Sequence, residues 1–256
     1  MATTITATAP TDVRSISPIG HDEAMSLADT EARRLLEVVD QLCEPDWSLP
    51  TECAGWDVKA LLSHVLGSME RDTRFPVFVG QFVAAQRATK RTARPMIDEM
   101  TARHVREHAH LSPSDLTRRM HELALRAVAG RRRRPALLRA MKMKASPPFE
   151  GTWTFGYLVD IILGRDNWMH RVDLCRAMRN PLVLTADHDG RIMADVIADW
   201  ARAHRQPFRL TLEGPAGGSF AQGTGGDELR LDAVEFCRIL SGRGDGSGLL
   251  THPIPF

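Results

Sequence analysis

Two side chains in the stretch RDNWMHRVD, residues 165–173, have the types and the spacing of a metal-ligand pair. Asp166 and His170 are four residues apart in a segment whose apolar spacing predicts a helix. At 1.5 Å of rise per residue they lie about 6 Å apart along the axis and on one helix face. A carboxylate and an imidazole in this arrangement can bind one divalent metal ion, although the same spacing also suits an ion pair within the helix.

A third ligand must come from another helix, and His64 in the sequence LLSHVLG is the candidate. Leucines and a valine at positions 61, 62, 65 and 66 surround it, so the imidazole lies on or near the apolar face of its helix. In a helical bundle His64, Asp166 and His170 would then form a site with one open position, which is typical of catalytic rather than structural zinc. The alternative is a core histidine that is hydrogen-bonded to the backbone.

Charged residues beside this pair have simpler expected roles. Asp173 lies three residues after His170 and can reach it on the same helix, where it would orient the imidazole as a neighbouring acceptor. A solvent-facing acid is the alternative for Asp173. Arg165 and Arg171 are expected to point away from the ligand pair, because a helix turns by about 100° per residue.

Four other patterns resemble functional motifs, and we interpret each of them as structural. His104–His108 matches the H-x-x-E-H string of some zinc peptidases, but its helix is polar and has no apolar seam, so a solvated helix face is expected. The run Arg131–Arg134 is interpreted as a solvated linker, because no aromatic residues are interleaved with it. The tripeptide RGD at 243–245 and the glycines between 214 and 226 are expected to form turns, and no Gly-Lys-Ser/Thr follows these glycines as a P-loop requires.

Helical periodicity dominates the chain up to about residue 180. Asp57 is the expected N-cap of the helix that carries His64, and Ser112 is the expected cap of another helix. The segment 131–150 is basic and then rich in proline, which indicates a mixture of helix and loop. The predicted helices cover 21–42, 57–76 with a continuation over 77–88, a region after Pro95, 116–129 and 155–178.

The pattern changes after Asn180-Pro181, where we expect a domain boundary. The sequence LVLT at 182–185 is typical of a strand, 187–204 of a helix, and FRLTLE at 208–213 alternates as a strand does. The glycine-rich segment up to residue 232 predicts hairpin strands and turns, and a last helix ends at Gly242. The predicted organisation is a disordered arm at 1–20, a helical domain at 21–180 and a small α+β domain at 181–256.

The composition excludes several classes of protein. Of the 256 residues, 43% are hydrophobic and 25% are charged, so the chain is globular rather than disordered. Because 33 Lys and Arg residues balance 32 Asp and Glu residues, no nucleic-acid partner is expected. No apolar run is long enough to form a transmembrane helix, so no membrane partner is expected either. The cysteines at 43, 53, 175 and 237 form no C-x-x-C pair and are expected to be free thiols. Since the N-terminus lacks the pattern of a secretory signal, the expected location is the cytoplasm.

Three segments of the chain resemble one family. The sequences GWDVKALLSHVLG at 55–67 and RDNWMHRVDL at 165–174 are similar to signatures of the second and fourth helices of the DinB-like, mycothiol-dependent maleylpyruvate isomerase family. The sequence LDAVEFCRILSGR at 231–243 resembles the small C-terminal domain of the same family. The resemblance implies a mainly α protein, with a DinB-like four-helix bundle and a small C-terminal α+β domain.

This resemblance also implies a divalent metal, usually zinc, that is bound by a histidine, a carboxylate and a second histidine. These ligands correspond to His64, Asp166 and His170. The carboxylate is often Glu in the family, and the shorter side chain of Asp166 would shift the metal or change its preference.

Members of the family use the low-molecular-weight thiol mycothiol as cosubstrate. A metal with an open position lowers the pKa of such a thiol, and the thiolate attacks an electrophilic carbon. The resemblance thus implies an isomerase or a thiol transferase that acts on a small electrophilic substrate, such as an unsaturated acid. In the isomerase an arginine of the C-terminal domain holds negative charge on the substrate. Arg243 is the best match and Arg238 is the alternative, while a surface role stays open for both.

Two other functions stay open at this stage. A zinc hydrolase would use the open position for a metal-bound water as nucleophile, and a thiol-dependence assay separates it from thiol chemistry. A DinB-like bundle that has kept only its fold would be a binding or stress-response module, and the metal content of the purified protein would reveal it. The complete set of ligands argues against this module.

Overall fold

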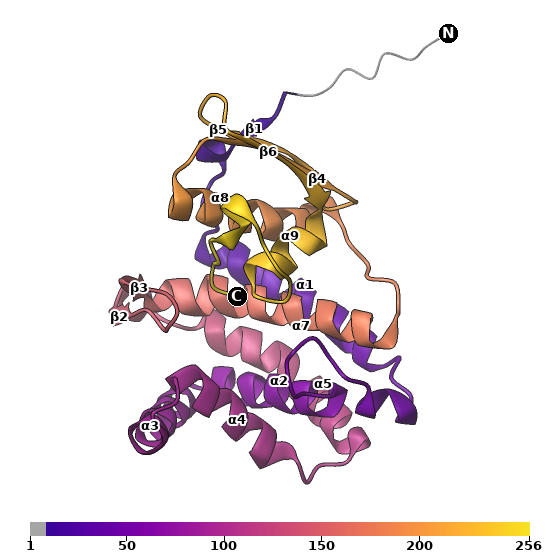
Figure 1. Ribbon diagram of the computed structural model, residues 1–256. Coiled ribbons are helices and arrows are strands. Elements are labelled where there is room, and N and C mark those ends of the chain that lie inside the picture. The colour runs from indigo at the N-terminus through magenta and orange to yellow at the C-terminus, as the bar shows by residue number, and fades with distance from the viewer. Residues whose placement is uncertain (1–8) are drawn as a thin grey trace. The chain divides into compact units, whose positions relative to one another are not determined.

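The computed structural model describes residues 9–256, which form two compact units. One unit contains residues 20–182 together with Phe256, and the other contains residues 9–19 and 183–255. The first unit is helical and the second is built on a β-sheet, as Figure 1 shows. The chain passes from one unit to the other two residues after Asn180-Pro181, where the sequence pattern changes.

The helical unit contains seven α-helices and a two-stranded ribbon in the described part of the chain. The helices are α1 (His21–Val39), α2 (Val58–Thr73), α3 (Phe75–Thr92), α4 (Met96–His108), α5 (Pro113–Arg132), α6 (Ala136–Arg139) and α7 (Leu163–Met178). A π-helical segment, Tyr157–Ile162, leads directly into α7. Between α6 and this segment, β2 (Lys142–Lys144) pairs antiparallel with β3 (Thr152–Thr154).

Four of these helices, α1, α2, α5 and α7, form the bundle. Helix α2 packs against α5 and α7, and α1 packs against the same two helices. Asp57 caps α2 as predicted, because its side chain accepts a hydrogen bond from the Ala60 N–H at 2.8 Å. The apolar residues of α2 at positions 61, 62, 65 and 66 are completely buried, and each contributes about 1.5–3 kcal/mol to stability. His64 lies among them and is therefore held in the core.

The interpretation of His104–His108 as a solvated helix face is wrong. Both histidines are buried, and α4 packs against α2. Gly67 of α2 leaves the space for the His104 ring, since a Cβ at position 67 would lie 2.4 Å from the ring carbon Cγ. Met100, His104 and His108 recur every four residues, so the buried stripe of α4 consists largely of imidazoles, and a search for apolar periodicity does not detect it.

His108 ties α4 to α2 through a partly buried ion pair with Glu70. Its Nδ1 donates to the His104 carbonyl oxygen at 2.7 Å, and its Nε2 lies 3.2 Å from Glu70 Oε2. Because both ring nitrogens face acceptors, the imidazolium form is favoured. Burial alone lowers the pKa of His108, but these two hydrogen bonds raise it, and the net shift is upward. Burial raises the pKa of Glu70, whereas His108 and Arg119 lower it, and the net shift is downward.

The run Arg131–Arg134 is only partly exposed, which corrects its interpretation as a solvated linker. Arg131 is buried, and its Nε donates to the Val159 carbonyl oxygen at 2.7 Å. Arg134 is also buried, with its guanidinium carbon 5.3 Å from the centre of the Phe75 ring. The two arginines between them are exposed. Two guanidinium groups of this run therefore pack against the helical unit.

The second unit is a mixed sheet with two helices on one face (Figure 1). The strand order is β1 (Thr11–Asp12), β5 (Gly218–Gln222), β4 (Phe208–Glu213) and β6 (Asp227–Asp232). The pairs β1–β5 and β4–β6 are parallel, whereas β4–β5 is antiparallel. The helices are α8 (Arg191–His204) and α9 (Ala233–Leu240). The Trp200 ring of α8 lies 4.7 Å from the Phe208 ring and 5.2 Å from the Phe236 ring, which joins both helices to β4.

Two expectations for this unit are wrong. The segment LVLT at 182–185 is irregular and forms no strand. The arm expected to be disordered at 1–20 is ordered from residue 11 onward, because β1 pairs with the edge of the sheet at β5 and a 3-10 turn follows at Val13–Ser15. For residues 1–8 this expectation lies outside the described residues. The predicted end of the last helix is correct, since Gly242 takes a φ of +82° after α9.

None of the helices in the described part of the chain is long and apolar enough to span a membrane.

We expect the stability contributed by His108 to depend on pH. Because its pKa is raised above about 6.5, the contribution is fully present below that pH and is lost as the pH rises through the folded-state pKa. His108→Gln should lower the free energy of unfolding by about 1 kcal/mol at pH 6 and by less above pH 7, as measured by urea denaturation. In Glu70→Gln the pKa of His108, measured by NMR, should be lower. A stability difference that is the same at both pH values would contradict this expectation.

Candidate metal centre

Helices α2 and α7 bring three of the predicted site residues together. His64 Nε2 is 3.9 Å from Asp166 Oδ2, and His170 Nε2 is 3.3 Å from Asp166 Oδ1. One ligand atom of each residue lies within 4.8 Å of the other two. Ligand atoms around one tetrahedral zinc ion are about 3.4 Å apart, so the two measured distances are close to those of a metal site.

The buried Nε2 of His170 indicates that these residues fit a cation. It lies 3.3 Å from Asp166 Oδ1 as an ion-pair contact but makes no hydrogen bond to any described residue. His170 Nδ1 lies 3.1 Å from Asp173 Oδ2 and carries the ring proton, because a carboxylate oxygen only accepts. In the neutral ring, Nε2 then presents a lone pair to the Asp166 carboxylate. Two facing acceptors need a positive charge between them, which is either a proton or a metal ion.

Electrostatics within the site agree with this arrangement. Burial lowers the pKa of His170, but the carboxylates of Asp166 and Asp173 raise it well above its usual value. Burial raises the pKa of Asp166, whereas His170 and His64 bring it well below its usual range. The pKa of His64 is lowered, mainly by burial. These shifts favour a proton held between His170 and Asp166. A metal ion would take the place of this proton, and metal binding would release it.

A chain of hydrogen bonds fixes the orientation of His64. The side-chain amide of Gln81 donates to the Gly67 carbonyl at 3.3 Å, so its oxygen faces His104 Nε2 at 2.8 Å. Nε2 of His104 carries the proton, and its Nδ1 accepts from His64 Nδ1 at 3.2 Å. The remaining lone pair of His64, on Nε2, lies on the side of Asp166.

Gln81 and His104 are functional candidates that sequence reasoning missed. Burial, together with the nearby His64 and Arg71, lowers the pKa of His104 to about 2, so its ring is neutral as this direction of hydrogen bonds requires. The only signal in the sequence is the stripe of imidazoles on α4 together with Gly67, one turn after His64. Neither feature indicates a functional role until the packing of α3 and α4 against α2 is known.

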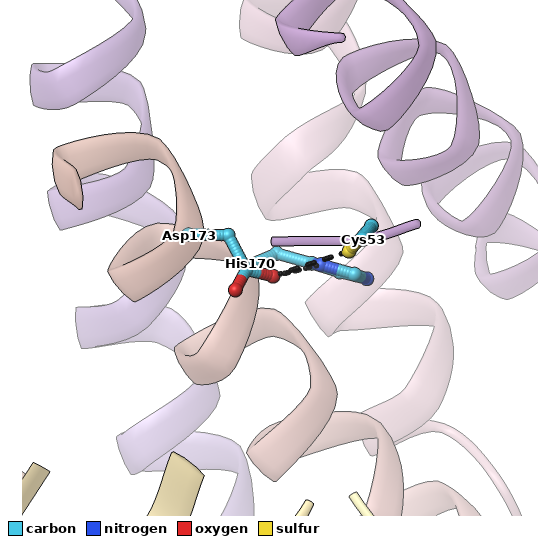
Figure 2. Close-up of side chains that lie close together, drawn as sticks. All are labelled: Cys53, His170 and Asp173. Carbon is cyan, nitrogen blue, oxygen red and sulfur yellow. Dashed lines mark hydrogen bonds and ion pairs between the residues drawn. The ribbon is translucent and has the colours of Figure 1, made fainter. Parts of the chain in front are cut away.

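Cys53 and Asp173 lie beside the other ring nitrogen of His170, as Figure 2 shows. Cys53 comes from the loop before α2, and its Sγ donates to Asp173 Oδ2 at 3.4 Å. These three side chains form a second group that could hold a metal ion. The two groups share His170, which cannot direct Nδ1 to a metal while that nitrogen donates to Asp173. Since Asp173 is completely buried, its contact fits the expected role of orienting the imidazole.

Arg171, next to His170, points away from the pair as expected. Its side chain is buried and forms two hydrogen bonds to Glu31 of α1, at 2.7 and 3.1 Å. Arg165 is buried as well. The bidentate pair between Arg171 and Glu31 joins α7 to α1 and thereby holds the helix that carries Asp166 and His170.

A cavity of about 130 Å³ lies against the candidate metal centre. His64 and Asp166 form part of its wall, together with Arg71 of α2. Arg71 Nε and Nη2 lie 2.9 and 3.3 Å from the two carboxylate oxygens of Asp72. Burial opposes the charge of Arg71, but Asp72 and Asp166 raise its pKa above the ordinary value, so it stays a cation. The cavity thus gives a small molecule access to His64 and Asp166.

The two predicted catalytic arginines belong to the second unit. Arg238 is buried there, forms an ion pair with Glu235, and donates to the carbonyl oxygen of Arg243 at 3.0 Å. This hydrogen bond closes the turn after α9. Arg243 is half-buried. The role of either arginine toward a substrate stays a prediction.

The fold and the site together define a helical bundle with a candidate metal centre in its core, followed by a small sheet unit. The family described as "Mycothiol maleylpyruvate isomerase N-terminal domain" matches residues 28–175, which is more than half of the chain and includes His64, Asp166 and His170. The chain therefore belongs to this family of enzymes, as its sequence motifs predict.

Comparison with solved structures confirms the predicted DinB-like fold. The crystal structure of the mycothiol-dependent maleylpyruvate isomerase has a TM-score of 0.58 and 17% sequence identity, over 92% of this chain and 94% of that chain. The crystal structure of a mutant of that isomerase has a TM-score of 0.57 and 16% identity, over 91% and 92% of the two chains. No curated protein matches the chain in sequence.

We expect Gln81→Leu to weaken zinc binding about 10- to 100-fold, because the substitution removes the acceptor that fixes the His104 and His64 tautomers. Competition with a chromophoric chelator measures the dissociation constant. Gln86→Leu on the same helix is the matched control, since Gln86 is exposed and should leave the affinity unchanged. Equal zinc affinities for the two variants would show that the chain of hydrogen bonds does not position His64.

Proposed function

We propose that this protein is a metal-dependent enzyme that uses mycothiol to isomerise a small electrophilic substrate or to transfer the thiol to it. The observation that carries the proposal is the convergence of His64 Nε2, His170 Nε2 and the Asp166 carboxylate, with His64 and Asp166 in the wall of one cavity. Membership of the mycothiol maleylpyruvate isomerase family supports the choice of thiol and of reaction.

His64, Asp166 and His170 are the proposed metal ligands. Two imidazoles and one carboxylate suit zinc and leave one coordination position for a ligand from solution. The metal bound there supplies Lewis acidity, which lowers the pKa of a thiol and keeps it as the nucleophilic thiolate at neutral pH. Asp173 accepts the Nδ1 proton of His170, and His104, which Gln81 orients, accepts the Nδ1 proton of His64. Both Nε2 lone pairs therefore stay available for a metal ion.

The proposed reaction conserves the thiol when it is an isomerisation. The thiolate sulfur bonds to a carbon of a double bond conjugated with a carbonyl group, and the electron pair moves to the carbonyl oxygen as an enolate. Rotation about the new single bond follows. The enolate then reforms the double bond and expels the thiolate, which gives the other geometric isomer. In a transfer reaction the enolate carbon instead takes up the proton that the thiol lost, and the carbon–sulfur bond remains.

Mycothiol dependence and metal dependence test the function together. The full-length protein loaded with zinc should isomerise maleylpyruvate or a related cis-unsaturated ketone only when mycothiol is present. His170→Ala should lower the zinc content, measured by elemental analysis, and remove this activity, because it deletes one of three ligands. His110→Ala is the control, since His110 is exposed on the segment after α4.

Two results would contradict the proposed function. Turnover that is independent of the thiol would favour the zinc hydrolase, in which metal-bound water is the nucleophile. Unchanged zinc content in His170→Ala would refute the ligand assignment.

Arg243 is proposed to hold the negative charge that builds on the substrate oxygen, with Arg238 as the alternative. The thiolate and this oxygen lie at different ends of the reacting group, so a second positive group is needed there. Arg243→Ala should keep its zinc and lose about a hundredfold or more in turnover. Arg238→Ala tests the alternative residue, which also closes the turn that carries Arg243. Arg230→Ala is the control, because the side chain of Arg230 is exposed. Full activity in both Arg243→Ala and Arg238→Ala would exclude a catalytic role for the second unit.

A further inference from the structure

Apart from His64, Arg71 and Asp166, the wall of the cavity is almost entirely apolar. Its side chains come from α3, α4, the β2–β3 ribbon and the π-helical segment, and they include Phe82, Met100, Met143, Trp153 and Ile162. Thr101 and Ser146 are the uncharged polar residues with a hydroxyl group among the described residues of the wall. A sugar-linked thiol such as mycothiol needs many hydrogen-bond partners, and this wall offers few of them. The cavity therefore suits the electrophile rather than the body of the thiol.

The apolar surface continues into a second hollow of about 180 Å³, which shares Phe78, Phe82 and Met143 with the cavity. Its rim reaches solvent, since Phe75 is 38% exposed and Met141 is 58% exposed. Apolar side chains grouped and exposed in this way are typical of a ligand groove. An apolar cavity of about 150 Å³ is known to hold benzene, so the two hollows together have room for a phenyl group and its attached chain.

Positive charge is scarce along this path. Arg71 is the only Lys or Arg among the described residues that line the cavity, and Lys142 is the only one that lines the second hollow, where it is exposed. Arg71 already neutralises Asp72, and its Nη1 faces the weak acceptor Met100 Sδ at 3.9 Å. One N–H group of Arg71 can therefore serve a ligand oxygen. A second carboxylate would be buried against aromatic and thioether groups without a cation, which is strongly unfavourable.

We propose that the electrophilic substrate of this protein carries an apolar group at least as large as a phenyl ring. This group takes the position that the second carboxylate has in a small unsaturated diacid. This inference rests on the proposed function, because it assigns the substrate class of the same site. The reacting carbonyl group lies toward His64 and Asp166, and the apolar group lies between Phe82, Met143 and Trp153.

A pair of unreactive ketones tests the inference without catalysis. Both 4-phenylbutan-2-one and 4-oxopentanoate contain a methyl ketone. At the other end of the chain the first carries a phenyl group and the second carries a carboxylate. Isothermal titration calorimetry with the full-length protein, before and after zinc loading, should give a dissociation constant at least tenfold lower for the phenyl ketone in both forms. Equal affinities, or tighter binding of 4-oxopentanoate to the metal-free protein, would overturn the inference.

Met143→Arg places a cation on the apolar wall and should reverse this preference. We expect at least tenfold weaker binding of the phenyl ketone and tighter binding of 4-oxopentanoate. Leu137→Arg is the matched control, because Leu137 is 85% exposed and lines neither hollow, and it should change both constants less than twofold. If folded Met143→Arg, checked by circular dichroism, keeps the preference of the wild type, the apolar group does not bind at this wall and the inference fails.

Turnover of the corresponding unsaturated ketones separates this inference from the proposed function. With mycothiol and zinc, (Z)-4-phenylbut-3-en-2-one should be isomerised with a kcat/KM at least tenfold higher than that of (Z)-4-oxopent-2-enoate. A larger kcat/KM for the carboxylate compound would leave the isomerase function intact and refute the apolar substrate class. If neither compound reacts while the phenyl ketone still binds more tightly, the isomerase function fails and the ligand class is retained.

Discussion

The candidate site depends on three acceptors that face one another between α2 and α7: the Asp166 carboxylate and the Nε2 lone pairs of His64 and His170. Such a group is unfavourable in a low-dielectric interior unless a cation lies between its members. The sequence of α7 places two of them one turn apart, and the apolar face of α2 carries the third into the bundle. A proton satisfies part of this demand, and a divalent metal ion satisfies all of it.

Both histidines present Nε2 for the same reason, although different elements provide it. Asp173 holds the Nδ1 proton of His170 from within α7, whereas His104 accepts the Nδ1 proton of His64 from across the bundle. The second contact needs Gly67, because any larger residue would collide with the His104 ring. The polar groups of α3 and α4 thus set the tautomer of a residue on α2, which is a constraint on packing as much as on chemistry.

Local signals in the sequence predict the part of this site that is local. The capped start of α2, the spacing of Asp166 and His170, and the apolar neighbours of His64 can each be recognised within one segment. The burial of His104 and Arg131 cannot, because polar side chains are assigned to the surface unless their partners on other helices are known. In the same way, β1 has only two residues and pairs with β5 from the far end of the chain, while LVLT has the composition of a strand but an irregular backbone, in which the Thr185 N–H donates to the Asp189 carboxylate.

The contrast between the charged ligand side of the cavity and its apolar wall has a chemical consequence. Water competes for the open position of a metal and protonates an enolate, and both effects work against addition followed by elimination of a thiol. Phe, Met and Trp side chains around the cavity exclude water without adding charges that would compete with Asp166 for the cation. In such surroundings the charge of Arg71 and of the ligand set acts over a longer range than it would in water. The apolar wall does not stabilise a thiolate or an enolate by itself, but it would strengthen the attraction of these charges to Arg71 and to a cation held by the ligand set.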